Sequence, residues 1–277
     1  MFKNVIKGAV IGVANVIPGI SGGTLALILG IYEKLTESIG EFFNVTRKKK
    51  VEYIIFLSQI MIGAGVGILI FAKLIEFLFK NHYEGTSFFF LGVIIASLPA
   101  IMHHKDKIHP KKNEVILFLI GGLIPLVLFF YQSFIKVSAV DGIDGTISSF
   151  YIIKLFLCGI IAGGTMVIPG ISGSLILMIL GEYYNVLGFI NNFKIFPMGM
   201  FAVGAAVGIF IFAKVMDKFL KRHKDETLYF ILGIVTLSLL EMWPGVTLNI
   251  SNIVLDMVVF CTGIFIVTRV RNIKIKR

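Results

Sequence analysis

Long apolar stretches separated by short polar loops run along the whole chain. Several are long enough, as helices, to cross the hydrocarbon layer of a bilayer, which is about 30 Å thick. The stretches form two series of five, at 5–17, 20–32, 53–79, 86–102 and 113–131, and at 152–167, 171–184, 197–219, 227–243 and 252–268. The pattern predicts an all-α integral membrane protein with many crossings.

The two series are also related residue by residue. Adding 151 to residues 17–30 gives 168–181, and nine of these fourteen positions are identical. Adding 141 to residues 63–80 gives 204–221, where ten of eighteen positions agree. The chain therefore contains two long copies of one unit, which is a layout typical of transporters.

The same phrase interrupts the apolar pattern once in each half. Residues 17–22 and 168–173 both read Ile-Pro-Gly-Ile-Ser-Gly. Proline lacks an amide proton and glycine disfavours helix, so the phrases predict helix breaks, at Pro18, Gly19, Pro169 and Gly170. A soluble turn or a simple kink would also fit one phrase. Two matched phrases favour a substrate-handling element, because freed backbone groups at membrane depth must line a protein or water-filled cavity.

Loop charge decides how the halves lie in the membrane. Lys and Arg gather in the stretches 47–50, 103–112, 218–224 and 269–277, as expected of cytoplasmic loops. All four reach the cytoplasmic side if each phrase forms a re-entrant hairpin that enters and leaves on one side. The sequence thus predicts six full transmembrane helices plus two re-entrant helical hairpins, with both termini cytoplasmic. The repeats, 1–140 and 141–277, would have inverted topology.

Small hydroxyl and glycine residues follow each proline-glycine pair: Ser21, Gly22, Gly23 and Thr24, and then Ser172, Gly173 and Ser174. They begin the second half-helix of each hairpin. A helix N-terminus offers free amides and a partial positive charge, so these residues predict a cradle for a phosphate or another anion. The alternative is that they only permit close helix packing. Whether the two tips meet is left open.

Ionisable residues within membrane segments are costly and therefore candidates for function. Lys73 and Lys214 occupy equivalent positions in the two halves, and either pair with Glu76 and Asp217 or provide countercharge for an anionic headgroup. Five polar residues are candidates for binding a coupling ion: Asn15, Glu33, Glu182, Glu76 and Asp217. For Glu33 and Glu182 the alternative is contact with interfacial water.

Composition and motifs exclude several classes of protein. With 57% hydrophobic residues, the formal charge of +10 indicates cytoplasmic loops beside anionic lipid, not nucleic-acid binding. The clustered histidines His103, His104 and His109 lie in one basic loop, which is interpreted as solvated. No Ser-His-Asp set, HExxH motif or Walker-type loop occurs in the membrane segments. The sequence predicts no enzyme, no metal and no cofactor.

The paired phrases resemble the bacterial polyprenyl-phosphate transporter family. The resemblance rests on residues 15–33 in the first half and 169–183 in the second, and it covers essentially the whole chain. It implies a flippase that returns undecaprenyl phosphate, the lipid carrier of cell-wall synthesis, to the cytoplasmic leaflet of the bacterial cell membrane. Where the first copy reads Gly-Gly-Thr the second reads Gly-Ser-Leu, so its tip has fewer hydroxyl donors.

Three functional hypotheses follow. The first is a lipid-phosphate flippase with undecaprenyl phosphate and membrane lipids as partners. The second is an ion channel or small-anion permease that uses the same tips, and the third is a membrane enzyme such as a lipid phosphatase. The sequence leaves open a homo-oligomer and coupling to a proton or a sodium ion.

Overall fold

The computed structural model describes residues 2–17, 21–101, 110–134, 149–245 and 250–275, and all regular secondary structure in these ranges is helical. The first half contains α1 (Phe2–Val16), α2 (Gly22–Ile28), α3 (Tyr32–Gly40), α4 (Arg47–Asn81), α5 (Tyr83–Ile101) and α6 (Lys112–Phe134). The second half contains α7 (Ser149–Val167), α8 (Gly173–Ile179), α9 (Tyr183–Asn191), α10 (Ile195–Arg222), α11 (Lys224–Ser238), the 3-10 helix η1 (Leu239–Met242) and α12 (Ile250–Ile275). Pro18, Gly19 and the three clustered histidines predicted above lie outside the described residues.

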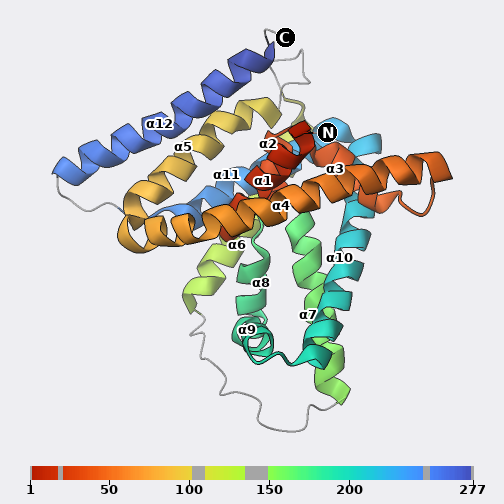
Figure 1. Ribbon diagram of the computed structural model, residues 1–277. Coiled ribbons are helices and arrows are strands. Elements are labelled where there is room, and N and C mark those ends of the chain that lie inside the picture. The colour runs from red at the N-terminus through yellow and green to blue at the C-terminus, as the bar shows by residue number, and fades with distance from the viewer. Residues whose placement is uncertain (1, 18–20, 102–109, 135–148, 246–249, 276–277) are drawn as a thin grey trace.

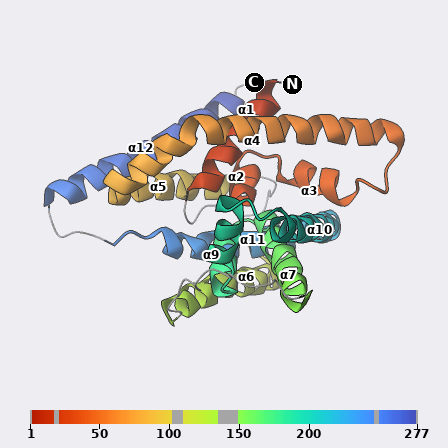
Figure 2. The same ribbon diagram turned by 60° about the horizontal axis from the view of Figure 1, so that its bottom comes forward.

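Within each half, one pair of helices packs through glycines. Gly8 and Gly12 of α1 lie against the backbone of α4, and a Cβ at either position would overlap a carbonyl oxygen. Gly159 and Gly163 of α7 lie against α10 in the same way. Small residues let helix backbones approach closely, which is how membrane helices associate without a hydrophobic driving force between them. In both views α7 lies beside α10 (Figure 1, Figure 2).

The remaining long helices pair across the two halves. Gly92 and Gly263 bring α5 and α12 into backbone contact, while Gly121 and Gly233 do the same for α6 and α11. The short helix α3 crosses from its own half to α10, where Gly40 lies against the backbone of Lys214. Each half therefore supplies helices to the packing of the other.

The helices of each glycine pair within a half run in the same direction. On α1, Gly8 meets Ile60, and one turn later Gly12 meets Ala64. Both numbers rise together, so α1 and α4 are parallel neighbours. From Gly159 to Gly163 along α7, the residues contacted on α10 also move to higher numbers, so these two helices are parallel as well. Figure 1 shows α1 and α7 approaching the middle of the molecule from different sides.

The helices confirm the prediction of a multi-pass, all-helical membrane protein. Four described helices are long and apolar enough to cross a membrane, namely α4, α6, α7 and α10, and the bent pair α8 and α9 makes a fifth if it is counted as one span. Three of the four coincide with predicted full spans. The fourth, α7, was predicted as half of a hairpin, yet its segment from Phe150 to Val167 is itself long enough to cross.

Candidate functional site

The first break is capped by its own polar residues. Ser21 is the N-cap of α2, and its Oγ accepts a hydrogen bond from the backbone N–H of Thr24 (3.2 Å). The backbone N–H of Gly22 donates to Oδ1 of Asn15 at 3.1 Å. These bonds satisfy amides that a helix start leaves without intrahelical partners. Ser21 and Thr24 are 6% and 3% exposed, so this tip lies inside the protein.

The second break has the same cap but a different environment. Ser172 is the N-cap of α8, and its Oγ accepts from the N–H of Leu175 at 3.5 Å. The hydroxyls of Ser172 and Ser174 lie 2.8 Å apart at an exposed position. Gly170 has φ of +83°, which favours glycine because L residues with a Cβ are strained there. Ser174 is exposed and Ser172 is half-buried, so this tip is open on one side, unlike the buried first tip.

The two breaks meet. The N–H of Gly170 donates to Oγ1 of Thr24 at 2.8 Å and to Oγ of Ser21 at 3.3 Å. Ser21 Oγ donates in turn to the carbonyl of Ile168 (3.5 Å), and the hydroxyl of Tyr32 donates to the carbonyl of Val167 (3.0 Å). Residues that follow the first break thus satisfy backbone groups that the second break frees, as buried backbone groups require.

The hydroxyl protons of the first tip suffice for this arrangement. Thr24 Oγ1 accepts from Gly170 and can donate to Ser21 Oγ, which lies 3.2 Å away. Ser21 then keeps its own proton for the carbonyl of Ile168. Each hydroxyl has a single proton, and this arrangement uses both protons. An anion would have to displace these bonds to use the Ser21 or Thr24 hydroxyl.

Both half-helices that follow the breaks are short. α2 and α8 have seven residues each, and each is followed by a glycine with positive φ, Gly30 at +65° and Gly181 at +72°. The peptide dipoles of two helical turns sum to only a small helix dipole. Hydroxyls and individual amides must therefore supply most of the attraction for an anion.

The lysines at equivalent positions do not pair with the acids three residues further on. Lys73, Lys214 and Glu76 are exposed, and within the described ranges neither lysine forms an ion pair. Asp217 is 3% exposed, and its Oδ2 accepts from Nζ of Lys221 at 2.7 Å. Spacings of three and four residues both place side chains on one helix face. The sequence alone therefore could not tell whether Asp217 pairs with Lys214 or with Lys221.

The two glutamates that follow the hairpins lie in opposite environments. Glu33 is exposed and pairs with Lys224 of α11 at 2.8 Å. Glu182 is 1% exposed, and its carboxylate accepts from the Tyr151 hydroxyl (2.6 Å), Asn185 Nδ2 (2.9 Å) and Lys154 Nζ (2.5 Å). Three donors from α7 and α9 therefore hold one buried carboxylate at the bend that follows Gly181.

A set of acids on α3 was missed by the sequence reasoning. Besides Glu33, Glu37 pairs with Lys49 of α4 at 2.9 Å, and Glu41 lies 3.9 Å from Lys221 of α10. The hydrogen bond from Lys49 holds the pKa of Glu37 below its usual value. The spacing Glu33, Glu37, Glu41 is i, i+4, i+8, which could have indicated one acidic face along a helix.

Apolar helices of spanning length, interrupted by breaks that come together inside the protein, define a multi-pass membrane protein built like a secondary transporter. The chain belongs to the family described as Undecaprenyl phosphate translocase-like, whose model matches residues 11–256. This match confirms the resemblance found in the sequence.

Two relatives named "Polyprenyl-phosphate transporter" are similar to the chain over most of its length. The protein from Vibrio cholerae serotype O1 is 33% identical over 249 residues, which cover 86% of this chain and 76% of the relative. The protein from Staphylococcus aureus is 32% identical over 270 residues, covering 95% and 93%. Both are named as transporters and neither as an enzyme. No solved structure matches the chain.

Proposed function

We propose that the protein is a flippase that moves undecaprenyl phosphate from the outer to the cytoplasmic leaflet, so that this carrier is reused in cell-envelope synthesis. Membership of the translocase-like family and the names of both relatives support the substrate class. The observation that carries the proposal is the meeting of the two breaks, with an open Ser172–Ser174 edge beside it. A charged phosphate cannot cross hydrocarbon unaided, and a polar station at membrane depth lowers that cost.

The proposed topology has six full spans and two re-entrant hairpins, with both termini in the cytoplasm. Parallel packing of α1 and α4 supports it, because parallel neighbours begin on the same side of the bilayer. The segment between them must then return the chain to the side where α1 began. The same argument applies to α7 and α10.

Matching glycine contacts support the inverted repeat, with units 1–140 and 141–277. Gly8 and Gly159 lie 151 residues apart, and the residues they touch, Ile60 and Phe201, lie 141 apart. These are the two offsets of the sequence repeat. Equivalent residues therefore make equivalent contacts in both halves.

We assign the phosphate to the second tip, at Ser172, Gly173 and Ser174. Their hydroxyls are open, whereas those of Ser21 and Thr24 are engaged on the backbone of the second break. We assign Gly22 and Gly23 instead to the contact between the two breaks, since Gly23 lies close to the carbonyls of Met166 and Val167. Lys73 and Lys214, both exposed, are countercharges for the headgroup on its way to and from the tip, while the prenyl tail stays in lipid.

Among the candidates for coupling we favour Glu182 with a proton. Protonation of its carboxylate would weaken its bonds to Lys154 and Tyr151, which tie α7 to the bend before α9. Glu33 and Glu76 are exposed, Asp217 pairs with Lys221 on its own helix, and Asn15 caps the first tip, whereas Glu182 is buried and joins two helices. We expect Glu182→Gln to make transport independent of a pH gradient, and an unchanged dependence would contradict this assignment.

Vesicles reconstituted with the protein and undecaprenyl phosphate test the proposal. A membrane-impermeant phosphatase added outside should hydrolyse the lipid of both leaflets if the protein is active, and only the outer pool if it is not. Ser172→Ala/Ser174→Ala should slow hydrolysis of the inner pool, while the matched control Ser58→Ala on α4 should not. Flux of inorganic phosphate without lipid movement would indicate a permease instead, and phosphate release without added phosphatase would indicate an enzyme.

A further inference from the structure

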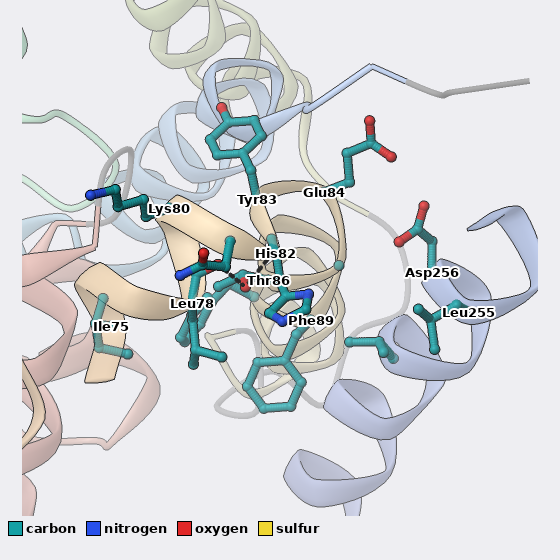
Figure 3. A pocket seen from close by; sticks show the side chains of 14 residues that line it. Ile75, Leu78, Lys80, His82, Tyr83, Glu84, Thr86, Phe89, Leu255 and Asp256 are labelled. Carbon is teal, nitrogen blue, oxygen red and sulfur yellow. Dashed lines mark hydrogen bonds between the residues drawn. The ribbon is translucent and has the colours of Figure 1, made fainter. Parts of the chain in front are cut away.

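A cavity of about 810 Å³ lies at the corner between α4 and α5, with α12 beside it (Figure 3). This volume falls within the range of about 300–1,000 Å³ that is usual for small-molecule sites. The corner is held by the Thr86 hydroxyl, which donates to the carbonyls of His82 (2.7 Å) and Leu78 (3.3 Å). It is remote in sequence from both Pro-Gly phrases.

The cavity has apolar walls and a rim with charges of both signs. The walls come from Ile75, Leu78, Phe89, Phe90, Leu255 and Val259. The rim carries Lys80 and His82 from the end of α4, together with the carboxylates of Glu84 and Asp256. Figure 3 shows Lys80 on one side of the opening, both acids on the other, and His82 between them over Phe89. A ligand that is complementary to this surface has an apolar chain, an anionic group and a cationic group.

Asp256 is the residue that indicates a ligand in this cavity. It lies on the apolar helix α12, is 7% exposed, and forms no ion pair with any residue in the described ranges. Its carboxylate lines the cavity beside apolar side chains and has no cationic partner among the described residues, so a ligand cation would pair with it favourably there. Gly85 leaves space beside this carboxylate, because a Cβ at position 85 would lie only 3.6 Å from Asp256 Oδ1.

The chemistry of the rim narrows the choice of cation. Among the described residues no group of three or more His, Cys, Asp or Glu side chains is arranged to hold a metal ion. A purely anionic lipid would place its phosphate near the carboxylates without offering Asp256 a partner. A primary ammonium, in contrast, donates charge-assisted hydrogen bonds to carboxylates, while Lys80 and His82 face the phosphate of the same headgroup.

We propose that this cavity binds a zwitterionic phospholipid with a primary amine, such as phosphatidylethanolamine, as a lipid that joins α12 to the α4–α5 corner. The acyl chain lies along the phenylalanines, the ammonium reaches Asp256, and the phosphate lies toward Lys80 and His82. The lining of this site contains no residue of either tip, and its ligand does not depend on the substrate that the tips carry.

Native mass spectrometry of the full-length protein tests the site, with dioleoyl phosphatidylethanolamine, phosphatidylcholine and phosphatidylglycerol offered in equal amounts. We expect phosphatidylethanolamine to be retained about tenfold more than phosphatidylcholine, whose quaternary amine has no proton to donate. Asp256→Asn, which keeps the shape of the side chain, should remove this preference, and the control Glu52→Gln on the exposed start of α4 should keep it. Gly85→Leu should reduce retention by filling the cavity while leaving the charges in place.

Equal retention of the three lipids by the unmodified protein would overturn the proposal, as would a preference for phosphatidylglycerol. A preference for phosphatidylethanolamine that survives both Asp256→Asn and Gly85→Leu would place the lipid elsewhere and would overturn it as well. Transport of polyprenyl phosphate is not needed for any of these measurements, so the outcome is independent of the proposed function.

Discussion

The two Ile-Pro-Gly-Ile-Ser-Gly phrases are identical in sequence and opposite in environment. At the first, Ser21 and Thr24 are buried and bind the backbone of the other break. At the second, Ser172 and Ser174 are open and bond to each other. The difference supports our proposal that the two copies have separate tasks, one holding the two breaks together and the other facing the ligand.

Two substitutions between the copies account for the difference. Thr24, whose hydroxyl accepts from Gly170, is replaced by the apolar Leu175 in the second copy. Asn15, which caps Gly22, is replaced by Met166. The second tip therefore lacks both a hydroxyl equivalent to that of Thr24, which accepts from the other break, and a side-chain amide equivalent to that of Asn15, which caps the helix.

The largest expected effect comes from the backbone of the second break. Gly170→Ala places a Cβ 2.9 Å from Cγ2 of Ile234 and 3.0 Å from the backbone of Val235, at φ of +83°. Gly181→Ala has a similar φ of +72° with nothing within 4 Å, so it isolates the conformational strain. We expect roughly 1–2 kcal/mol of strain in both variants and about 1–3 kcal/mol of overpacking in Gly170→Ala alone. Equal shifts of the thermal midpoint would show that the break is not packed as described.

The contact between the two breaks is tested by Thr24→Val, which removes the nearer acceptor of Gly170 N–H and nearly keeps the side-chain shape. The buried amide then keeps only the longer bond to Ser21 Oγ, which should lower the free energy of unfolding by about 1–2 kcal/mol. Thr262→Val on the exposed face of α12 is the matched control, for which we expect a change within about 0.5 kcal/mol. If both variants unfold alike, the contact between the two breaks does not stabilise the protein.

A smaller effect is expected from Asn15→Met, which makes the first tip resemble the second at this position. The N–H of Gly22 loses its acceptor, and loss of a cap of this kind costs about 0.5–2 kcal/mol. Hydrogen exchange followed by mass spectrometry should speed up in peptides around residue 22 and stay unchanged around residue 173. Unchanged exchange at both tips would indicate that Asn15 does not cap the first.

The sequence predicted much of this framework. The apolar pattern located α4, α6 and α10, and the Pro-Gly phrases located both breaks and the short helices that begin after them. It could not predict that Thr24 meets Gly170, because periodicity shows which face of a helix is polar and not which neighbour covers that face. The burial of Glu182 and the choice of Lys221 by Asp217 were hidden for the same reason, since each depends on how distant helices pack.

The central claim, that the second tip binds phosphate while the first holds it in place, is tested most directly by titration. Undecaprenyl phosphate is titrated into the purified protein and into Ser172→Ala/Ser174→Ala, and the dissociation constant and thermal midpoint are measured for each. We predict that affinity falls about tenfold or more with the loss of two hydrogen bonds to a charged group, while the thermal midpoint falls only by what the loss of the Ser172 cap costs, about 0.5–2 kcal/mol. Unchanged affinity in this double variant would contradict the claim.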